Sequence, residues 1–169
     1  LVIWLHEDER GRADRASRQV EQLTNYDGLT GLPNRSLFAS RLAGHLPEAA
    51  VARQRYVVAA FGPDNPRQLR EALGEGAVEV LLQRIAARLR MLVPGPEPLV
   101  ARIDGDRFAV GFGPVNGTEA AIARAQELRT RLDEAAGDVR SDLVFTSSAG
   151  IALYPDDARE ADGLIAAAL

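Results

Sequence analysis

The stretch ARIDGDRFAVGF, residues 101–112, decides the fold of this chain, because it reads as two strands joined by a tight turn. Residues 98–103 favour extended backbone, and the acidic sequence at 104–106 is typical of a hairpin loop. Large and small apolar side chains then alternate, which places the large ones on one face of a second strand. The stretch predicts an antiparallel hairpin with two carboxylates at its tip, followed at once by Arg107.

Outward from the hairpin, strands and helices alternate along the chain. The apolar run RYVVAAF at 55–61 predicts a buried strand, and residues 143–154 have the β propensity of another. Helices are expected over 67–73, 76–92 and 117–136, and from 158 to Leu169, where the last helix is cut off. Strands that alternate with helices but include a hairpin indicate an α+β fold, with helices packed on an antiparallel or mixed sheet.

The composition is that of a soluble globular domain, since 46% of the 169 residues are hydrophobic and 26% are charged. A net charge of −4 gives no basic footprint, which argues against nucleic acid as a partner. The absence of cysteine excludes disulfides and thiolate metal sites and fits a reducing compartment, so a cytoplasmic location is expected. No apolar run approaches the roughly 20 residues that span a bilayer, so no membrane segment is expected.

Residues 1–24 differ in character from the rest of the chain. Residues 1–5 are apolar and β-prone, and a highly charged helix is expected after them. Small and apolar side chains recur on that helix at spacings of three and four, and they form a narrow seam of Ala13, Ala16, Val20 and Leu23. The seam predicts either weak pairing with a second copy of the chain, as a homodimer, or a solvated connector helix.

Three segments resemble the GGDEF domain, the diguanylate cyclase module. They are DGLTGLPNR at 27–35, the ARIDGDRF hairpin at 101–108 and SAGIALYPDD at 148–157, in the order and near the spacing of that family. The resemblance implies a fold akin to the palm of nucleotide cyclases and polymerases, with a central five-stranded, mainly antiparallel sheet flanked by helices. It also implies a reaction in which two GTP-loaded domains meet and join their substrates into cyclic di-GMP, with two divalent metals held by acidic residues.

The hairpin departs from the motif that names the family, since it reads Asp104-Gly105-Asp106-Arg107-Phe108. By the resemblance, Asp106 falls on the metal-ligand carboxylate, which is retained. Arg107 falls on the acidic residue implicated in catalysis, and a guanidinium can neither bind a metal nor accept a proton. Asp104 replaces the first glycine of the motif, so a negative side chain faces the path of the phosphates.

The second metal-binding element of the family is also altered. The segment GEGAVEVLL at 74–82 resembles the family's GHxxGDxLL, and this register places the main metal-binding aspartate at Gly62 and a guanine-reading asparagine at Arg70. Asp64 remains open as a displaced metal ligand in a shifted register. The RxxD pattern of product inhibition has no counterpart at 95–98.

Some features of a nucleotide site persist in the same register. Arg67 keeps the charge of a phosphate-contacting lysine, and Glu79 keeps the acidity of a guanine-contacting aspartate. With Asp106 they form the possible residual nucleotide-binding set. No cofactor is expected, and GTP with Mg²⁺ would bind weakly; Asp106 is at most a lone metal ligand.

The resemblance therefore implies a degenerate GGDEF domain at 25–169 that has lost diguanylate cyclase activity. Residues 1–17 are similar to the strand and connector that join a PAS sensor to a GGDEF domain, so 1–24 would be the end of a PAS-like domain plus a connector helix. We expect a regulatory module in cyclic di-GMP signalling, which relays a signal to a downstream EAL domain or another signalling protein. Two alternatives stay open: a GTP-binding allosteric switch without turnover, and a residual cyclase.

Overall fold

The computed structural model describes the backbone of residues 2–137 and 145–169, and the side chains within these ranges from Gly11 onward. The helices are α1 (Val2–Asn25), α2 (Arg35–Val51), α3 (Pro66–Leu73), α4 (Glu75–Leu92), α5 (Thr118–Gly137) and α6 (Ala161–Ala168). The strands are β1 (Arg55–Pro63), β2 (Val100–Asp104), β3 (Arg107–Val115) and β4 (Ser147–Tyr154). These elements confirm the α+β class, the hairpin and the helices expected at 67–73, 76–92 and 117–136. Residues 143 and 144 of the expected last strand lie outside the described residues.

The strands form one antiparallel sheet in the order β2-β3-β1-β4. Central β1 pairs with β3 on one side, where Phe61 lies opposite Phe108, and with β4 on the other, where Phe61 lies opposite Ala149. The expectation of five strands is wrong for the described residues, which contain four. The fifth strand rested on the family resemblance alone; after β4 the described chain continues as α6, which packs on the sheet and adds no strand to its edge.

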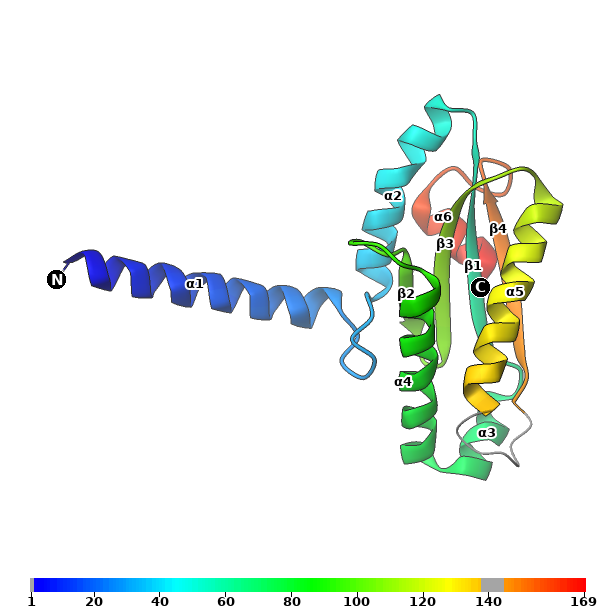
Figure 1. The fold of residues 1–169 in the computed structure, drawn as a ribbon, viewed down its shortest axis with the longest axis horizontal. Helices are drawn as coiled ribbons and strands as arrows, with labels where there is room; N and C mark the ends of the chain where they lie inside the picture. Colours follow the sequence, from blue (N-terminus) through cyan, green and yellow to red (C-terminus); the bar gives the residue numbers. More distant parts are fainter. Residues whose placement is uncertain (1, 138–144) are drawn as a thin grey trace.

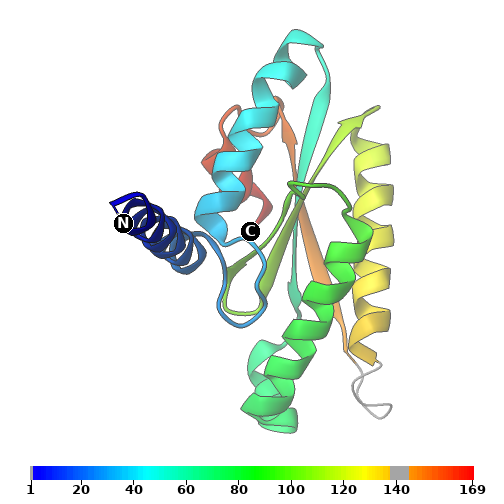
Figure 2. The same cartoon turned by 60° about the vertical axis from the view of Figure 1, so that its left-hand side comes forward.

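Helices cover both faces of the sheet. In Figures 1 and 2, α4 and α5 lie against one face, while α2 and α6 lie against the other. Alternate residues of β1 supply the two cores: Ala59 and Phe61 pack toward α4 and α5, and Val58 and Ala60 pack toward α2 and α6. This explains why the 55–61 run is apolar at consecutive positions, since a strand covered on both faces has no solvent side.

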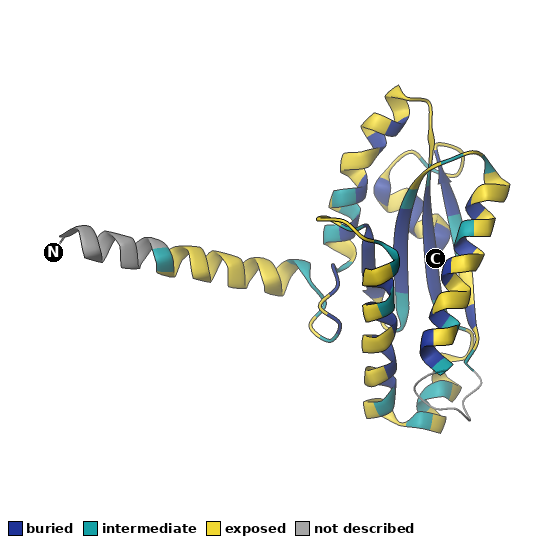
Figure 3. Ribbon diagram, in the orientation of Figure 1, coloured by how far each residue is buried: buried dark blue, intermediate teal, exposed yellow. Residues whose placement is uncertain are grey.

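Helix α1 extends away from the body of the domain (Figure 1), and its described side chains are exposed along most of its length (Figure 3). The β-prone stub expected at 1–5 is wrong for residues 2–5, which belong to this helix. An extended segment needs a neighbouring strand for its backbone groups, whereas a helix satisfies most of them internally. None of the described helices is long and apolar enough to cross a membrane.

Candidate functional site

The hairpin turn lies beside the end of β1. Asp104 pairs with Arg107 in the β2–β3 register, which leaves Gly105 and Asp106 as the loop. Gly105 has φ +39°, a backbone conformation that a glycine adopts without steric cost. Since Phe108 lies opposite Phe61, the residues of the turn sit next to Gly62.

Arg107 turns back onto the hairpin. Its Nε and Nη2 donate to the two carboxylate oxygens of Asp104, at 2.8 and 2.6 Å. This contact raises the pKa of the Arg107 guanidinium, so the side chain keeps its charge. The stem of Arg107 lies over Gly62, and a Cβ built on Gly62 would stand 3.0 Å from the Arg107 Cγ. Gly62 therefore leaves room for Arg107, and an aspartate at 62 would press on the arginine that occupies this space.

Asp106 is held by an arginine from α3. Its side chain is 10% exposed and forms an ion pair with the Nη2 of Arg70, while the Nη1 of Arg70 pairs with Glu75. The hydrogen bond to Glu75, together with the charge of Asp106, raises the pKa of Arg70. At 62 and 70 the sequence pointed only to losses. The structure adds that Arg70 neutralises the carboxylate that the hairpin retains.

A cleft of about 580 Å³ opens over these residues. Its walls are mostly small or apolar, and its lining consists of Ala60, Phe61, Gly62, Pro63, Pro66, Asp104, Asp106, Arg107, Ser148, Ala149, Gly150, Ala168 and Leu169. Within residues 11–137 and 145–169, no three His, Cys, Asp or Glu side chains lie together in a way that could hold a metal ion. The residues present do not fit a two-metal centre, because each carboxylate of the cleft already faces a guanidinium.

The other expected site residues lie outside this arrangement. Arg67 has a 93% exposed side chain and pairs with Glu71 on its own helix, and Glu79 is exposed on α4. Asp64, the candidate displaced ligand, accepts a hydrogen bond from Ser148 at 2.5 Å, which lowers the pKa of Asp64. Asp64 does not line the cleft. The structure thus brings Asp104, Asp106 and Arg107 together, and leaves Arg67 and Glu79 engaged elsewhere or facing solvent.

Arg102, which the sequence analysis did not single out, links the hairpin to the loop that follows α1. Arg102 donates through Nη1 to both carboxylate oxygens of Asp27, at 3.0 and 3.1 Å, and through Nε to the carbonyl of Gly105 at 2.8 Å. Asp27 also accepts from the backbone N–H and the hydroxyl of Thr30, at 2.8 and 2.7 Å. Burial by itself would raise the pKa of Asp27, but the Thr30 and Arg102 contacts outweigh it and the pKa is lowered. The loop at 27–31 and the hairpin turn are thereby fixed to each other.

Comparison with known proteins decides the family. A family model described as "Diguanylate cyclase, GGDEF domain" matches residues 24–168. This chain belongs to the GGDEF family. The resemblance found in the sequence and the fold that it implied are confirmed, apart from the fifth strand.

Among curated relatives, the cyclic di-GMP phosphodiesterase NbdA of Pseudomonas aeruginosa is 30% identical over 152 residues, which are 90% of this chain and 19% of that protein. The diguanylate cyclase TpbB of the same species is 31% identical over 153 residues, or 90% of this chain and 35% of TpbB. The chain therefore spans about a fifth to a third of these relatives. Their names include both a cyclase and a phosphodiesterase, so the family does not by itself assign an activity to this domain.

Solved structures agree on the fold. A sensory box/GGDEF family protein from Caulobacter crescentus superposes with a TM-score of 0.69 at 34% identity, covering 86% of this chain and 93% of that one. The coiled coil and GGDEF domain of DgcB from the same species, in complex with c-di-GMP, superposes with a TM-score of 0.75 at 21% identity. This match covers 98% of the present chain and 87% of the DgcB chain. The second likeness concerns the fold alone.

Proposed function

We propose that this GGDEF domain is a regulatory module of cyclic di-GMP signalling that does not synthesise cyclic di-GMP. The observation that carries the proposal is the pairing of both cleft carboxylates with arginines, Asp104 with Arg107 and Asp106 with Arg70. A divalent cation binds where carboxylates converge without a competing cation. In this cleft two fixed guanidinium groups hold the carboxylates instead.

The expected loss in catalytic rate favours complete inactivity over reduced activity. The loss of one preorganised electrostatic group typically lowers a catalytic rate on the order of 10²–10³-fold. Here Gly62 lacks the family's aspartate, Arg107 replaces an acid by a cation, and Arg70 replaces a guanine reader and also engages Asp106. Losses of this kind in one site should leave no turnover above background.

A second candidate is a GTP-binding switch without turnover, and the cleft itself favours it. A volume of about 580 Å³ lies within the ~300–1,000 Å³ of typical small-molecule sites, and its walls are largely apolar. A nucleotide there would have to face Asp104 and to draw Asp106 or Arg70 out of their ion pair. Arg67 and Glu79 would have to turn toward the ligand.

The proposal also covers the domain boundaries, the cellular location and the partners of the domain. We place the GGDEF domain at 25–169, in the cytoplasm, with residues 1–24 as a connector after a PAS-like sensor. An EAL-type domain or another signalling protein is the partner that would receive its signal. Support comes from the longer relatives, since the phosphodiesterase NbdA and the bifunctional cyclase/phosphodiesterase MucR of Pseudomonas aeruginosa both contain much more chain than matches here. The exposed seam of α1 supports pairing with a second copy.

The test is a synthesis assay with the purified protein, GTP and either Mg²⁺ or Mn²⁺, with product followed by chromatography and TpbB as the positive control. We expect no cyclic di-GMP, and none from Arg107→Glu alone, because Gly62 still leaves the metal site without its carboxylate. Clear turnover by the unmodified chain would refute the proposal. Tight, metal-dependent GTP binding in calorimetry without turnover would favour the switch.

A further inference from the structure

A second cleft, unrelated to the hairpin, lies at the opposite end of β1. It has a volume of about 400 Å³ and is formed where α2 ends, β1 begins and β4 turns toward α6. Its charged lining residues are Arg53, Arg55, Asp156 and Arg159. Since Arg55 and Pro63 are the two ends of β1, about 26 Å of extended strand separates the two clefts. Occupancy of one cleft can therefore be measured separately from occupancy of the other.

The charge of this cleft opposes that of the whole chain. Three arginines and one aspartate give the lining a net charge of +2, whereas the chain carries −4. Arg55 donates to Asp156 at 2.6 Å, so one arginine is neutralised. Within the described part of the chain, the guanidinium groups of Arg53 and Arg159 form no hydrogen bond or ion pair, although the backbone N–H of Arg53 donates to the carbonyl of Ala50. Two unpaired guanidinium groups thus border one hollow, whose lining carboxylate, Asp156, already pairs with Arg55.

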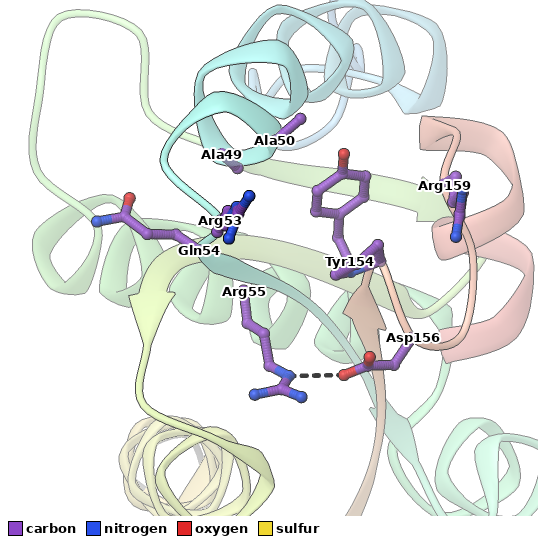
Figure 4. A pocket seen from close by; sticks show the side chains of 9 residues that line it. Ala49, Ala50, Arg53, Gln54, Arg55, Tyr154, Asp156 and Arg159 are labelled. Carbon is purple, nitrogen blue, oxygen red and sulfur yellow. Dashed lines mark hydrogen bonds and ion pairs between the residues drawn. The ribbon is translucent and has the colours of Figure 1, made fainter.

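The hydroxyl of a largely buried tyrosine, Tyr154, lies at the same hollow. Tyr154 is only 9% exposed, and its ring packs in the core shared with α2 and α6. Figure 4 shows the ring standing in the cleft between Arg53 and Arg159, with the hydroxyl at its outer end. No described residue forms a hydrogen bond with this hydroxyl. Since none of the buried side-chain N and O atoms in the described residues lacks a partner, this unpaired hydroxyl is accessible from the cleft, where a ligand can accept its hydrogen bond.

We propose that this cleft binds a small molecule that carries a phosphate group. A planar carboxylate is satisfied by one guanidinium fork, whereas a phosphate has three terminal oxygens and can accept from two guanidinium groups and a hydroxyl together. That set of donors comes from Arg53 in the turn between α2 and β1, Tyr154 at the end of β4 and Arg159 in the loop between β4 and α6. A volume of about 400 Å³ leaves space beyond the phosphate for the rest of a small ligand.

The test measures binding of inorganic pyrophosphate by calorimetry at low ionic strength, with citrate as a carboxylate probe of comparable charge. The cleft variant is Arg53→Gln with Arg159→Gln, which keeps the side-chain stems. Its matched control is Arg124→Gln with Arg131→Gln, which removes the same charge from two ion-paired arginines on α5 whose side chains are 41% and 54% exposed. Tyr154→Phe removes the hydroxyl alone.

We expect saturable pyrophosphate binding that weakens at least tenfold in the cleft variant, weakens several-fold in Tyr154→Phe and is unchanged in the control. Thermal melting of each variant checks that it is folded. If Tyr154→Phe does not fold, the comparison between the cleft variant and the control variant tests the proposal. Absence of saturable binding, an equal loss in the control, or equally tight citrate binding would each overturn the proposal. Binding only to vesicles that contain phosphatidylglycerol would also overturn it, because the ligand would then be a membrane surface.

Discussion

The link between Asp27 and Arg102 predicts how strongly the α1 junction is held to the hairpin. Arg102→Ala removes a two-oxygen ion pair whose side chains are only 15% and 21% exposed, together with the Arg102 hydrogen bond to the Gly105 carbonyl. Hydrogen bonds to charged groups contribute about 1.5–3 kcal/mol, and Asp27 keeps its Thr30 contacts, so we expect a loss of about 2 kcal/mol in the free energy of unfolding. For a domain of this size that corresponds to a fall in Tm of about 4–8 °C.

The measurement is thermal and urea unfolding of the unmodified chain and the variant at pH 7. Arg131→Ala is the control, because it breaks an ion pair with Glu134 whose side chains are 54% and 52% exposed, and it should change stability by less than about 1 kcal/mol. A double-mutant cycle with Asp27→Asn should return a coupling energy above about 1 kcal/mol. An Arg102→Ala protein that melts within a degree of the unmodified chain would show that the link does not stabilise the junction.

Three further predictions concern acid stability, packing and association. The pKa of Asp27 is lowered on folding, so the stability that its carboxylate contributes is complete above the ordinary value of 3.8 and is lost as pH falls through the folded pKa. In acid unfolding, the difference in stability between the unmodified chain and Asp27→Asn should therefore narrow below about pH 4, and a constant difference would contradict this. A Cβ on Gly150 would stand 2.1 Å from the carbonyl oxygen of Ala168, so Gly150→Ala should displace the end of α6 and lower the free energy of unfolding in urea by about 1–3 kcal/mol. Gly44 in α2 has open space around it, so Gly44→Ala should raise that free energy by about 0.5–1 kcal/mol, and equal effects of the two substitutions would refute the packing argument. Val20 and Leu23 are 63% and 80% exposed on α1, so sedimentation at high protein concentration should show a weak dimer that Val20→Asp abolishes. A strict monomer before and after the substitution would contradict the prediction that the seam pairs two copies of the chain.

Local patterns in the sequence determined much of this domain. The hairpin at 101–112 was predictable because turn chemistry and alternation act over neighbouring residues, and the consecutive apolar residues at 55–61 already indicated a buried strand. The motif segments indicated the family, and with it the replacement of an acid by Arg107. Local propensity misled at residues 2–5, where an apolar run without a neighbouring strand is part of a helix.

Only the tertiary structure decided which groups neutralise one another. Arg70 and Asp106 are 36 residues apart, and Arg102 and Asp27 are 75 apart, so no local pattern could pair them. The fit of the Arg107 stem over Gly62 depends in the same way on the register of β3 against β1. The sequence by itself determined which residue types stand in the hairpin and at position 62, and with the family resemblance it predicted that carboxylates of the family are altered, because residue type is read one position at a time. That the remaining carboxylates face guanidinium groups was decided by the fold, because an ion pair depends on distances that only the packed sheet and helices set.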